Sequence, residues 1–383
     1  MLCIKNGLVN DAVNREPYIA DILVDSGKIS AIGVNLDVPE GTEIIDASGL
    51  EVYPGFVEAH AHTGMDGHGA GSIQADYNEM NDIVTPQLRA IDGINPMDQG
   101  MRAAALAGVT TVCTGPGSTN VLGGTFAAVK TWGKRIDDMI VKEAIGMKCA
   151  FGENPKTWHK SSTTSRMTTA FYLRQALAKA KEYMQQKEAA GDDISKMPAL
   201  DMKHEALIPV LKKEIPLKAH AHRADDIFTA IRIAREFDVN ITLDHCTDGA
   251  LISEELAKEG LPAFVGPTLG AKSKIELKNK SFTTPAALHA AGVPISIITD
   301  APVIPLQNLP MCAGLAANAG LPMEEAWRSI TINPALQTGI GDRVGSLEPG
   351  KDADVVIWQA DPLTTVGAGA WVTIIDGKVV YRA

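Results

Sequence analysis

The chain has 383 residues, of which 45% are hydrophobic and 21% are charged, and its formal net charge is −11. These values are typical of a soluble globular protein with a large core, and the negative charge argues against a nucleic-acid partner, because phosphate binding requires a basic surface. The five cysteines are scattered, and we expect no signal peptide and no membrane span, so the sequence predicts a cytoplasmic protein without disulfides.

Short β-strands are predicted at both ends of the chain. The N-terminal part contains strand-like runs, and Ser26-Gly27-Lys28 is a turn signal between two of them. The C-terminal part has the same texture, with an Asp376-Gly377 turn between two β-rich runs. We therefore predict that residues 1–53 and 341–383 pair into one small composite domain.

Residues 54–340 alternate between apolar strands and helical stretches. This alternation predicts parallel strands joined by helices, and eight such units have the size of a (β/α)₈ TIM barrel. Seven strands are visible as apolar runs, and we expect the eighth in the helix-rich stretch before residue 206. The Gly-rich segments 115–118 and 121–124 are predicted to be tight turns. Helices are predicted for residues 97–107, 168–187, 206–213, 224–237, 252–259, 284–291 and 323–330.

Two histidines end the first of these barrel strands. Side chains two residues apart on a strand point to the same side, so His60 and His62 aim two imidazoles at one point. Neutral imidazole is a common ligand for zinc and similar ions. Active sites of such barrels lie at the C-terminal ends of the strands, where this chain carries further candidate groups. These groups are Lys148 or Glu153, His220 with His222, His245 and Asp300, and they predict a catalytic metal site.

Several motifs along the chain are shared with one enzyme superfamily. They are Asp46-Ala47-Ser48-Gly49, Pro54-Gly55-Phe56 before the histidine pair, Gly108-Val109-Thr110-Thr111, His245, Thr299-Asp300-Ala301-Pro302 and the stretch from Gly345 to Asp354. With these motifs the chain resembles the amidohydrolase superfamily, and its imidazolonepropionase-related members in particular. The resemblance implies a TIM barrel with a β-sandwich built from both termini. It also implies a metal-dependent hydrolase that cleaves a carbon–nitrogen bond in an amide, a cyclic amide or an N-acyl or dipeptide substrate.

The resemblance implies a role for each residue at a strand end. His60 and His62 match the ligands of the first strand, His220 matches that of the fifth, and His245 matches that of the sixth. Asp300 matches the aspartate of the last strand, which in this superfamily touches the metal and takes a proton from its water as the general base. The implied cofactor is one or two divalent ions, with zinc as the first choice, although imidazole ligands do not by themselves fix the metal.

Two residues compete for the ligand that bridges a pair of metals, which in relatives is a carboxylated lysine or a glutamate. Lys148-Cys149-Ala150 is similar to the lysine strand of isoaspartyl dipeptidases, and Gly152-Glu153 to the glutamate of adenine deaminases and amino-sugar deacetylases. Because Glu153 follows the last apolar residue of its strand, the sequence favours Glu153, and Lys148 stays the alternative.

Three further residues are candidates for contact with a small-molecule substrate. His222 shares a strand face with His220 and is either a ligand or a substrate contact, and Arg223 follows it directly. His68 lies in a Gly-rich loop after the first barrel strand, and loops of this kind bind substrates. Assembly into a homo-oligomer is left open by the sequence.

Two other functions compete with the hydrolase. A deaminase of an amino-substituted ring would use the same metal site, and the sequence does not separate the two reactions. A non-enzymatic barrel, as in microtubule-associated relatives of dihydropyrimidinases, would lack the full metal set. The presence of all five implied ligands argues against that alternative; they are His60, His62, His220, His245 and Asp300.

Overall fold

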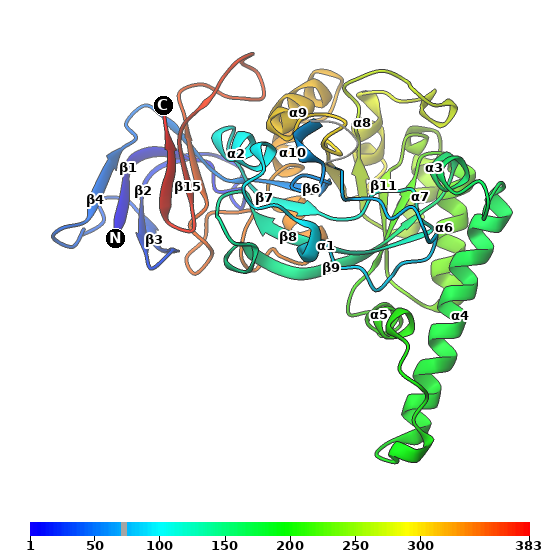
Figure 1. The fold of residues 1–383 in the computed structure, drawn as a ribbon. Coiled ribbons are helices and arrows are strands. Elements are labelled where there is room, and N and C mark those ends of the chain that lie inside the picture. Colours follow the sequence, from blue (N-terminus) through cyan, green and yellow to red (C-terminus); the bar gives the residue numbers. More distant parts are fainter. Residues whose placement is uncertain (70–74) are drawn as a thin grey trace.

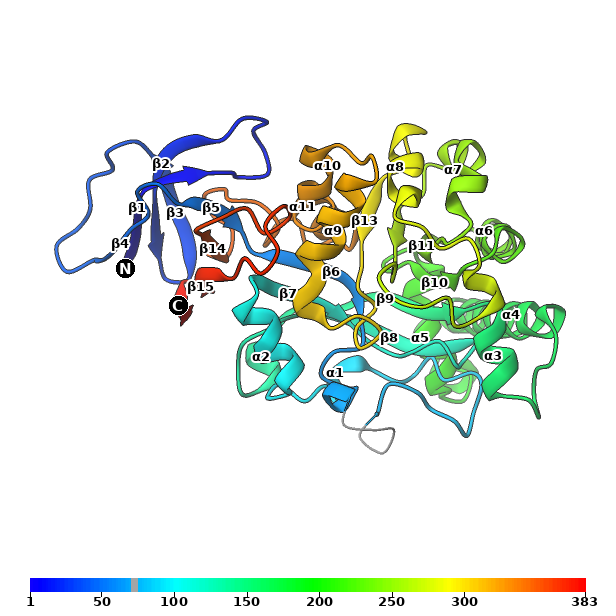
Figure 2. The same ribbon diagram turned by 90° about the horizontal axis from the view of Figure 1, so that it is seen from above.

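The computed structural model describes residues 1–69 and 75–383 and contains two β-sheets, each with its own buried core (Figure 1). The smaller core joins residues from both ends of the chain, such as Ile4, Val52 and Ile374. Both termini lie on the smaller sheet (Figures 1 and 2). Among the described residues, no helix is both long and apolar enough to span a bilayer.

The smaller sheet is built from the two ends of the chain. Its strands are β1 (Leu2–Val9), β2 (Tyr18–Asp25), β3 (Lys28–Gly33), β4 (Glu43–Asp46), β5 (Glu51–Pro54), β14 (Val355–Trp358), β15 (Ala370–Ile375) and β16 (Lys378–Arg382). They follow the order β16-β15-β14-β5-β1-β2-β3, with β4 paired to β1. The C-terminal strands join the N-terminal ones where β14 runs antiparallel to β5, with Val356 opposite Tyr53. The predicted separate sheet from both termini is confirmed, and its exact boundaries after residues 53 and 340 stay a prediction.

The larger sheet forms the barrel. Its strands in the described part of the chain are β6 (Phe56–Ala61), β7 (Val109–Thr114), β8 (Leu122–Lys130), β9 (Ile140–Ala150), β10 (Leu217–Ala221), β11 (Ile241–His245), β12 (Ala263–Val265) and β13 (Ile295–Ile297). They pair in sequence order, and β13 returns to the side of β6, so the sheet is nearly closed. The pairs β6–β7 and β9 through β13 are parallel. The predicted α/β barrel is confirmed.

The eighth strand is not where the sequence predicted it. The helix-rich stretch before residue 206 contributes no strand in the described chain. The eighth strand of the barrel is β8, which lies between β7 and β9 and runs antiparallel to both. The two glycines at the start of β8 caused the error, because Gly123 and Gly124 favour a turn. Gly124 has φ +118, and a Cβ there would lie 2.3 Å from the carbonyl oxygen of Leu88. The glycine thus permits a close approach of two backbones rather than a turn.

Helices connect the strands and cover the outside of the barrel (Figure 2). The predicted helix over residues 224–237 agrees with α6 at both ends, because its apolar residues recur with helical spacing. Helix α9 was missed because its sequence is apolar nearly all round and shows no such period. The helices are α1 (Ala90–Gly93), α2 (Gln99–Leu106), α3 (Glu153–Trp158), α4 (Arg166–Ala190), α5 (Met202–Leu211), α6 (Ala224–Phe237), α7 (Ser253–Glu259), α8 (Thr283–Ala290), α9 (Leu309–Asn318), α10 (Met323–Arg328) and α11 (Ile332–Gln337).

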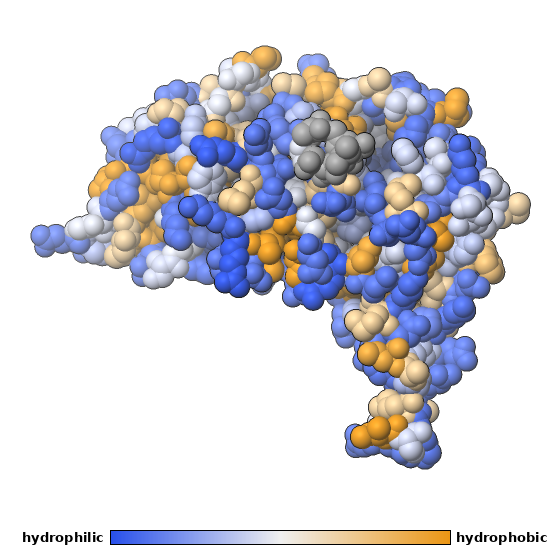
Figure 3. Space-filling model, viewed as in Figure 1, coloured by the Kyte–Doolittle hydropathy of each residue, from blue (hydrophilic) through white to orange (hydrophobic). Residues whose placement is uncertain are grey.

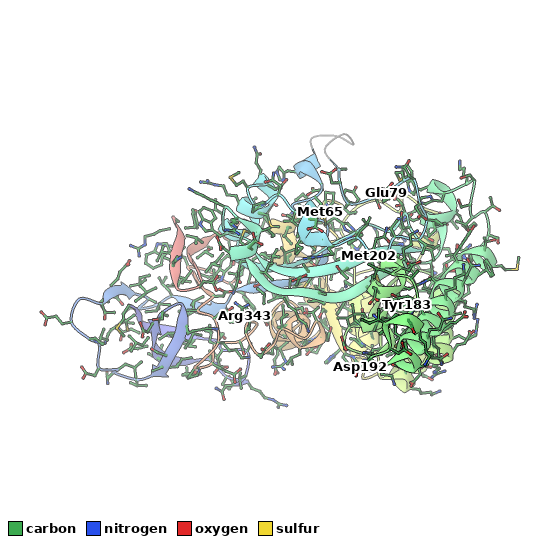
Figure 4. The ribbon with its side chains drawn as sticks, turned by 60° about the horizontal axis from the view of Figure 1, so that its bottom comes forward. Met65, Glu79, Tyr183, Asp192, Met202 and Arg343 are labelled. Carbon is green, nitrogen blue, oxygen red and sulfur yellow. The ribbon has the colours of Figure 1, made fainter. Side chains whose placement is uncertain are left out.

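Helices α4 and α5 form a projection that extends away from the barrel (Figure 1). Tyr183 on α4 donates a hydrogen bond of 2.6 Å to Glu205 on α5, which ties the two helices together. Figure 4 shows Tyr183, Asp192 and Met202 together in this region. Hydrophobic surface appears at its free end (Figure 3), where the side chain of Ile194 is 86% exposed.

A buried ion network joins the two sheets. Lys130, at the end of β8, places its Nζ 3.0 Å from Asp352, 2.7 Å from Asp354 and 3.2 Å from Asp376. These aspartates belong to the C-terminal segment that enters the smaller sheet. Arg343, which Figure 4 shows where the two sheets meet, also contacts Asp352 at 2.7 Å. A lysine of the barrel, Lys130, therefore compensates the negative charges of these three aspartates.

Removing the buried cation should loosen the junction between the sheets. The substitution Lys130→Met leaves Asp354 and Asp376 without the charge that compensates them, and breaking a buried ion pair from one side costs about 3–5 kcal/mol. Urea unfolding measures this loss. Arg135→Met, which removes an exposed partner of Asp137, is the control and should leave the unfolding midpoint unchanged. Equal midpoints for Lys130→Met and wild type would contradict the role of the network.

Candidate metal centre

Parallel pairing of the barrel strands brings five predicted ligands to one end of the barrel. His60 lies on β6, and His62 follows that strand directly. His220 and His245 stand one register position apart near the ends of neighbouring parallel strands, since His220 is paired with Asp244 and Ala221 with His245. The fifth ligand, Asp300, follows β13. All four histidines are buried.

Asp300 links the two histidines of the first strand. Its Oδ1 lies 3.5 Å from Nε2 of His60 and 3.2 Å from Nε2 of His62. The backbone at Asp300 has φ +52, a conformation that non-glycine residues rarely adopt and that is concentrated at functional sites. The two imidazoles thus converge on one carboxylate, as their spacing along the strand predicts.

A second group of imidazoles adjoins the first. The ring of His245 lies 4.4 Å from that of His220 and 4.7 Å from that of His222, measured between centroids. One nitrogen from each of these three rings lies within 4.8 Å of the others, and His245 also belongs to a group with His60 and Asp300. The two groups share His245, so the described residues offer ligands for one ion or for a pair.

The hydrogen bonds of these histidines leave ligand nitrogens free. Nδ1 of His62 lies 2.7 Å from the carbonyl oxygen of Gly115, and Nδ1 of His245 lies 2.8 Å from that of Gly266. Because a carbonyl oxygen only accepts, Nδ1 carries the proton and Nε2 keeps its lone pair. Nε2 of His220 and of His245 are buried and have no hydrogen-bond partner among the described residues. A divalent cation fits these unpartnered acceptors.

Burial keeps these rings in the neutral form that binds metals. It holds the pKa of His220 and of His222 well below the ordinary value for histidine. Burial likewise lowers the pKa of His245 to about 3. Loss of hydration penalises the imidazolium form, so each ring presents a lone pair rather than a charge.

Beneath the histidines lies a fully buried charge cluster, of which the sequence predicted Lys148 and His60 as site residues but not Asp244 and Lys218. Asp244 places Oδ2 2.9 Å from Nδ1 of His60 and 3.6 Å from Nζ of Lys148, and its Oδ1 accepts a hydrogen bond of 2.9 Å from Lys218. Burial opposes the charge of Asp244, but Lys218 and His60 hold its pKa well below the usual range. Burial lowers the pKa of Lys148 to about 8. Charged residues inside the apolar strands β10 and β11 were the signal for this cluster.

Glu58 connects the first and last strands of the barrel. Its Oε1 accepts a hydrogen bond of 2.9 Å from the backbone N–H of His60. Its Oε2 accepts from the N–H and the hydroxyl of Thr299, at 2.8 and 2.6 Å. Burial raises the pKa of Glu58 to about 7. One carboxylate therefore sets the relative position of His60 and of the segment that carries Asp300.

The other predicted site residues have different surroundings. Lys148 lies inside the barrel with Nζ 3.3 Å from Nε2 of His60. Glu153 begins α3, and its Oε1 accepts the N–H of Glu276 at 3.1 Å, so the structure does not bring it into the imidazole cluster. Arg223 pairs with exposed Asp225 at 2.8 Å, and His68 is exposed, so neither joins the cluster.

A cavity of about 450 Å³ opens above the cluster. His62, His220, His222 and Asp300 contribute to its lining, so a substrate in the cavity would meet these groups directly. The ring of Tyr77 also lines the cavity and stacks on His62 with a centroid distance of 5.0 Å. The arrangement suits a reaction in which metal-held and carboxylate groups act on one small molecule.

Replacing the carboxylate of Asp244 should weaken metal binding. We expect Asp244→Asn to bind zinc about 10- to 100-fold more weakly, because His60 loses the partner that orients its ring. Competition with a chromophoric chelator measures the affinity, and the melting temperature of the metal-free protein reports the fold. Asp225→Asn, at a 52% exposed side chain, is the control and should match wild type. Unchanged zinc affinity in folded Asp244→Asn would show that this carboxylate does not orient the ligand.

The comparisons with known proteins agree on one family. The family model described as "Amidohydrolase family" matches residues 52–380. The chain is 29% identical over 395 residues to the amidohydrolase tasK of Hapsidospora irregularis, an alignment that covers 95% of this chain but only 40% of that protein. It is 30% identical over 150 residues to an imidazolonepropionase of Bacillus velezensis, which covers 38% of this chain and 34% of that protein.

A solved structure matches the whole chain. The crystal structure of an amidohydrolase from Thermotoga maritima has a TM-score of 0.96 and 40% sequence identity, and the match covers 100% of both chains. Since the family model also matches most of the sequence, this chain belongs to the Amidohydrolase family, whose members hydrolyse carbon–nitrogen bonds, as its motifs predicted.

Proposed function

We propose that this protein is a metal-dependent hydrolase that cleaves a carbon–nitrogen bond in a small molecule, such as an amide, a cyclic amide, an N-acyl compound or a dipeptide. The observation that carries the proposal is the buried, unpartnered Nε2 of His220 and of His245 beside the Asp300 carboxylate. Unpaired acceptors of this kind are costly to bury unless a ligand satisfies them. The cavity above them gives a substrate access.

The residues that would hold the metal are His60, His62, His220 and His245, together with Asp300. Zinc is the first choice, because it accepts imidazole and carboxylate ligands, and the two groups that share His245 fit one ion or two. A divalent ion bound there supplies Lewis-acid chemistry, which lowers the pKa of water and polarises a carbonyl group. His222 is a member of the second group, where it would act as a ligand or contact the substrate.

Lys148 is our candidate for the bridging ligand, in place of Glu153. Its Nζ lies 3.3 Å from Nε2 of His60, within the cluster, whereas the carboxylate of Glu153 is engaged with Glu276. In the proposed reaction the neutral Nζ amine adds to carbon dioxide, a new N–C bond forms, and one proton is released. The resulting carbamate would offer two oxygens as ligands to the divalent ion or ions held by the histidines.

Asp300 is proposed as the general base. Its carboxylate lines the cavity and contacts both His60 and His62, so it is close to the ligands and accessible to a substrate. A carboxylate in this position can take a proton from water and later give it to the leaving nitrogen. Both transfers use the same atom position, so the base would return to its starting form after each turnover.

Hydrolysis of a chosen panel tests the function. Zinc-loaded protein is assayed with lactams, hydantoins, dipeptides, N-acyl amino acids and amino-substituted rings, and loss of each substrate and formation of its hydrolysis product are followed by chromatography. Turnover of at least one class, abolished by a chelator and restored by zinc, is the expected result. The absence of turnover across the panel would contradict the proposal, and release of ammonia only from aminated rings would favour the deaminase.

Metal content distinguishes the two bridging candidates. We expect Glu153→Gln to keep the full metal content, because the amide oxygen can still accept the N–H of Glu276. Lys148→Ala should lose bound metal, with wild-type loading dependent on bicarbonate. Elemental analysis of both variants, loaded with and without bicarbonate, makes the measurement. Loss of metal in Glu153→Gln with full content in Lys148→Ala would reverse the assignment.

Replacing the proposed base, Asp300, should lower turnover without unfolding the protein. We expect Asp300→Asn to keep the fold while kcat falls by at least about 10²-fold, the usual range for a lost acid–base group. Metal content, melting temperature and kcat are measured on one preparation. If Asp300 only stabilises its loop, the melting temperature falls while kcat stays near wild type, and Asp300 is then excluded from the mechanism.

A further inference from the structure

One charged side chain stands out in the wall of the cavity. Apart from the histidines and Asp300, Lys274 is the only charged residue among the described residues that line it. The five residues outside the description, 70–74, include no charged side chain in the sequence. Much of the remaining wall is apolar, with Trp158, Leu277 and Val303 among its members. An anionic group in the cavity would thus find one cation away from the proposed metal site.

Lys274 is held in place from the protein side. Its Nζ donates a hydrogen bond of 2.7 Å to Oδ1 of Asn154 and one of 3.1 Å to Oε1 of Glu276. Asn154 is fixed in turn by its hydrogen bond of 2.7 Å to Ser118. An ammonium group has three N–H donors, and two of them are used here. The third remains for a group in the cavity.

The carboxylate of Glu276, which accepts from Lys274, is held in place by a reciprocal pair of hydrogen bonds with Glu153. The N–H of Glu153 donates to Oε2 of Glu276 at 2.8 Å, and the N–H of Glu276 donates to Oε1 of Glu153 at 3.1 Å. Gly152 allows this contact, because it has φ +84 and a Cβ there would lie 2.5 Å from Oε2 of Glu276. The loop between β12 and α8 is therefore pinned to the start of α3. Lys274 stands on this pinned loop.

The ion pair is asymmetric with respect to solvent. The side chain of Glu276 is 0% exposed, whereas that of Lys274 is 29% exposed. Arg166 also lies 4.0 Å from Glu276, so the buried carboxylate has a second cation nearby. The positive member of the pair is thus the one that reaches the cavity. In a protein with a net charge of −11, such a local cation would offset the repulsion of an anionic substrate.

We propose that Lys274 determines specificity for substrates that carry a free carboxylate at some distance from the bond that is cleaved. The inference rests on the proposed hydrolase function and adds the substrate class. The carboxylate would accept the remaining N–H of Lys274, and the scissile bond would lie over the histidine cluster. Because Asn154 and Glu276 fix the ammonium group beforehand, little side-chain entropy is lost on binding.

Matched substrates test the charge requirement. N-acetyl amino acids and dipeptides are compared with the corresponding C-terminal amides, which lack only the negative charge. We expect wild type to prefer the free acids. Lys274→Met should lower kcat/KM for the acids about 10- to 10²-fold, mainly through a higher KM, and leave kcat/KM for the amides unchanged.

Two further variants serve as controls. Lys274→Arg should retain most of the preference for the acids. Lys272→Met, an exposed lysine on the same loop that does not line the cavity, is the control and should match wild type.

Binding of the acids and amides can be measured even if none of them is hydrolysed. Calorimetry follows the same acids and amides as they bind to zinc-loaded Asp300→Asn protein, with and without Lys274→Met. Preference for the acids that disappears in Lys274→Met supports the inference even when no member of the panel is hydrolysed. Equal binding of acids and amides, equal losses on both forms in Lys274→Met, or no binding at millimolar concentration would overturn it.

Discussion

The charge of Asp244 has to be compensated inside the barrel, and the groups that compensate it include His60 of the histidine cluster above. A carboxylate without exposure to water needs cationic or donor partners, and here these are Lys218 and His60, with Lys148 nearby. The contact with His60 directs its Nδ1 to the carboxylate and leaves Nε2 for the cluster. Removal of Lys218 would leave Asp244 without the cation that donates to its Oδ1, so the buried carboxylate depends on this pair.

The strand ends above this unit are fixed by a second buried carboxylate. Glu58 bonds to the backbone of His60 and to Thr299, which precedes Asp300, so it spans the point where the barrel closes. The positive φ of Asp300 then turns its side chain toward the histidines. Site geometry therefore depends on hydrogen bonds that backbone N–H groups donate to a buried carboxylate, and these resist distortion because neither partner has access to water.

At the rim of the cavity, carboxylates also accept hydrogen bonds from backbone N–H groups, but there they position a cation. Glu153 and Glu276 bind each other's backbone N–H groups, and the pair supports Lys274 at the cavity wall. The carboxylate of Glu276 thus positions a cation, and the same Oε1 lies 3.9 Å from Nε2 of His222.

The sequence alone determined the class of fold and the family, and it named the histidines and the aspartate that the structure brings together, because these depend on local patterns. Alternation of strands and helices, the spacing of His60 and His62, and the motif around Asp300 are all contained within short stretches. The tertiary structure decided which partners these residues meet. It showed β8 as the eighth strand, since Gly123 and Gly124 serve a backbone contact with residue 88 that no local pattern contains. It likewise separated Lys148 from Glu153. Both stand near one strand end in sequence, but an inward strand position and the start of a helix point their side chains to different neighbours, and only long-range packing sets that direction.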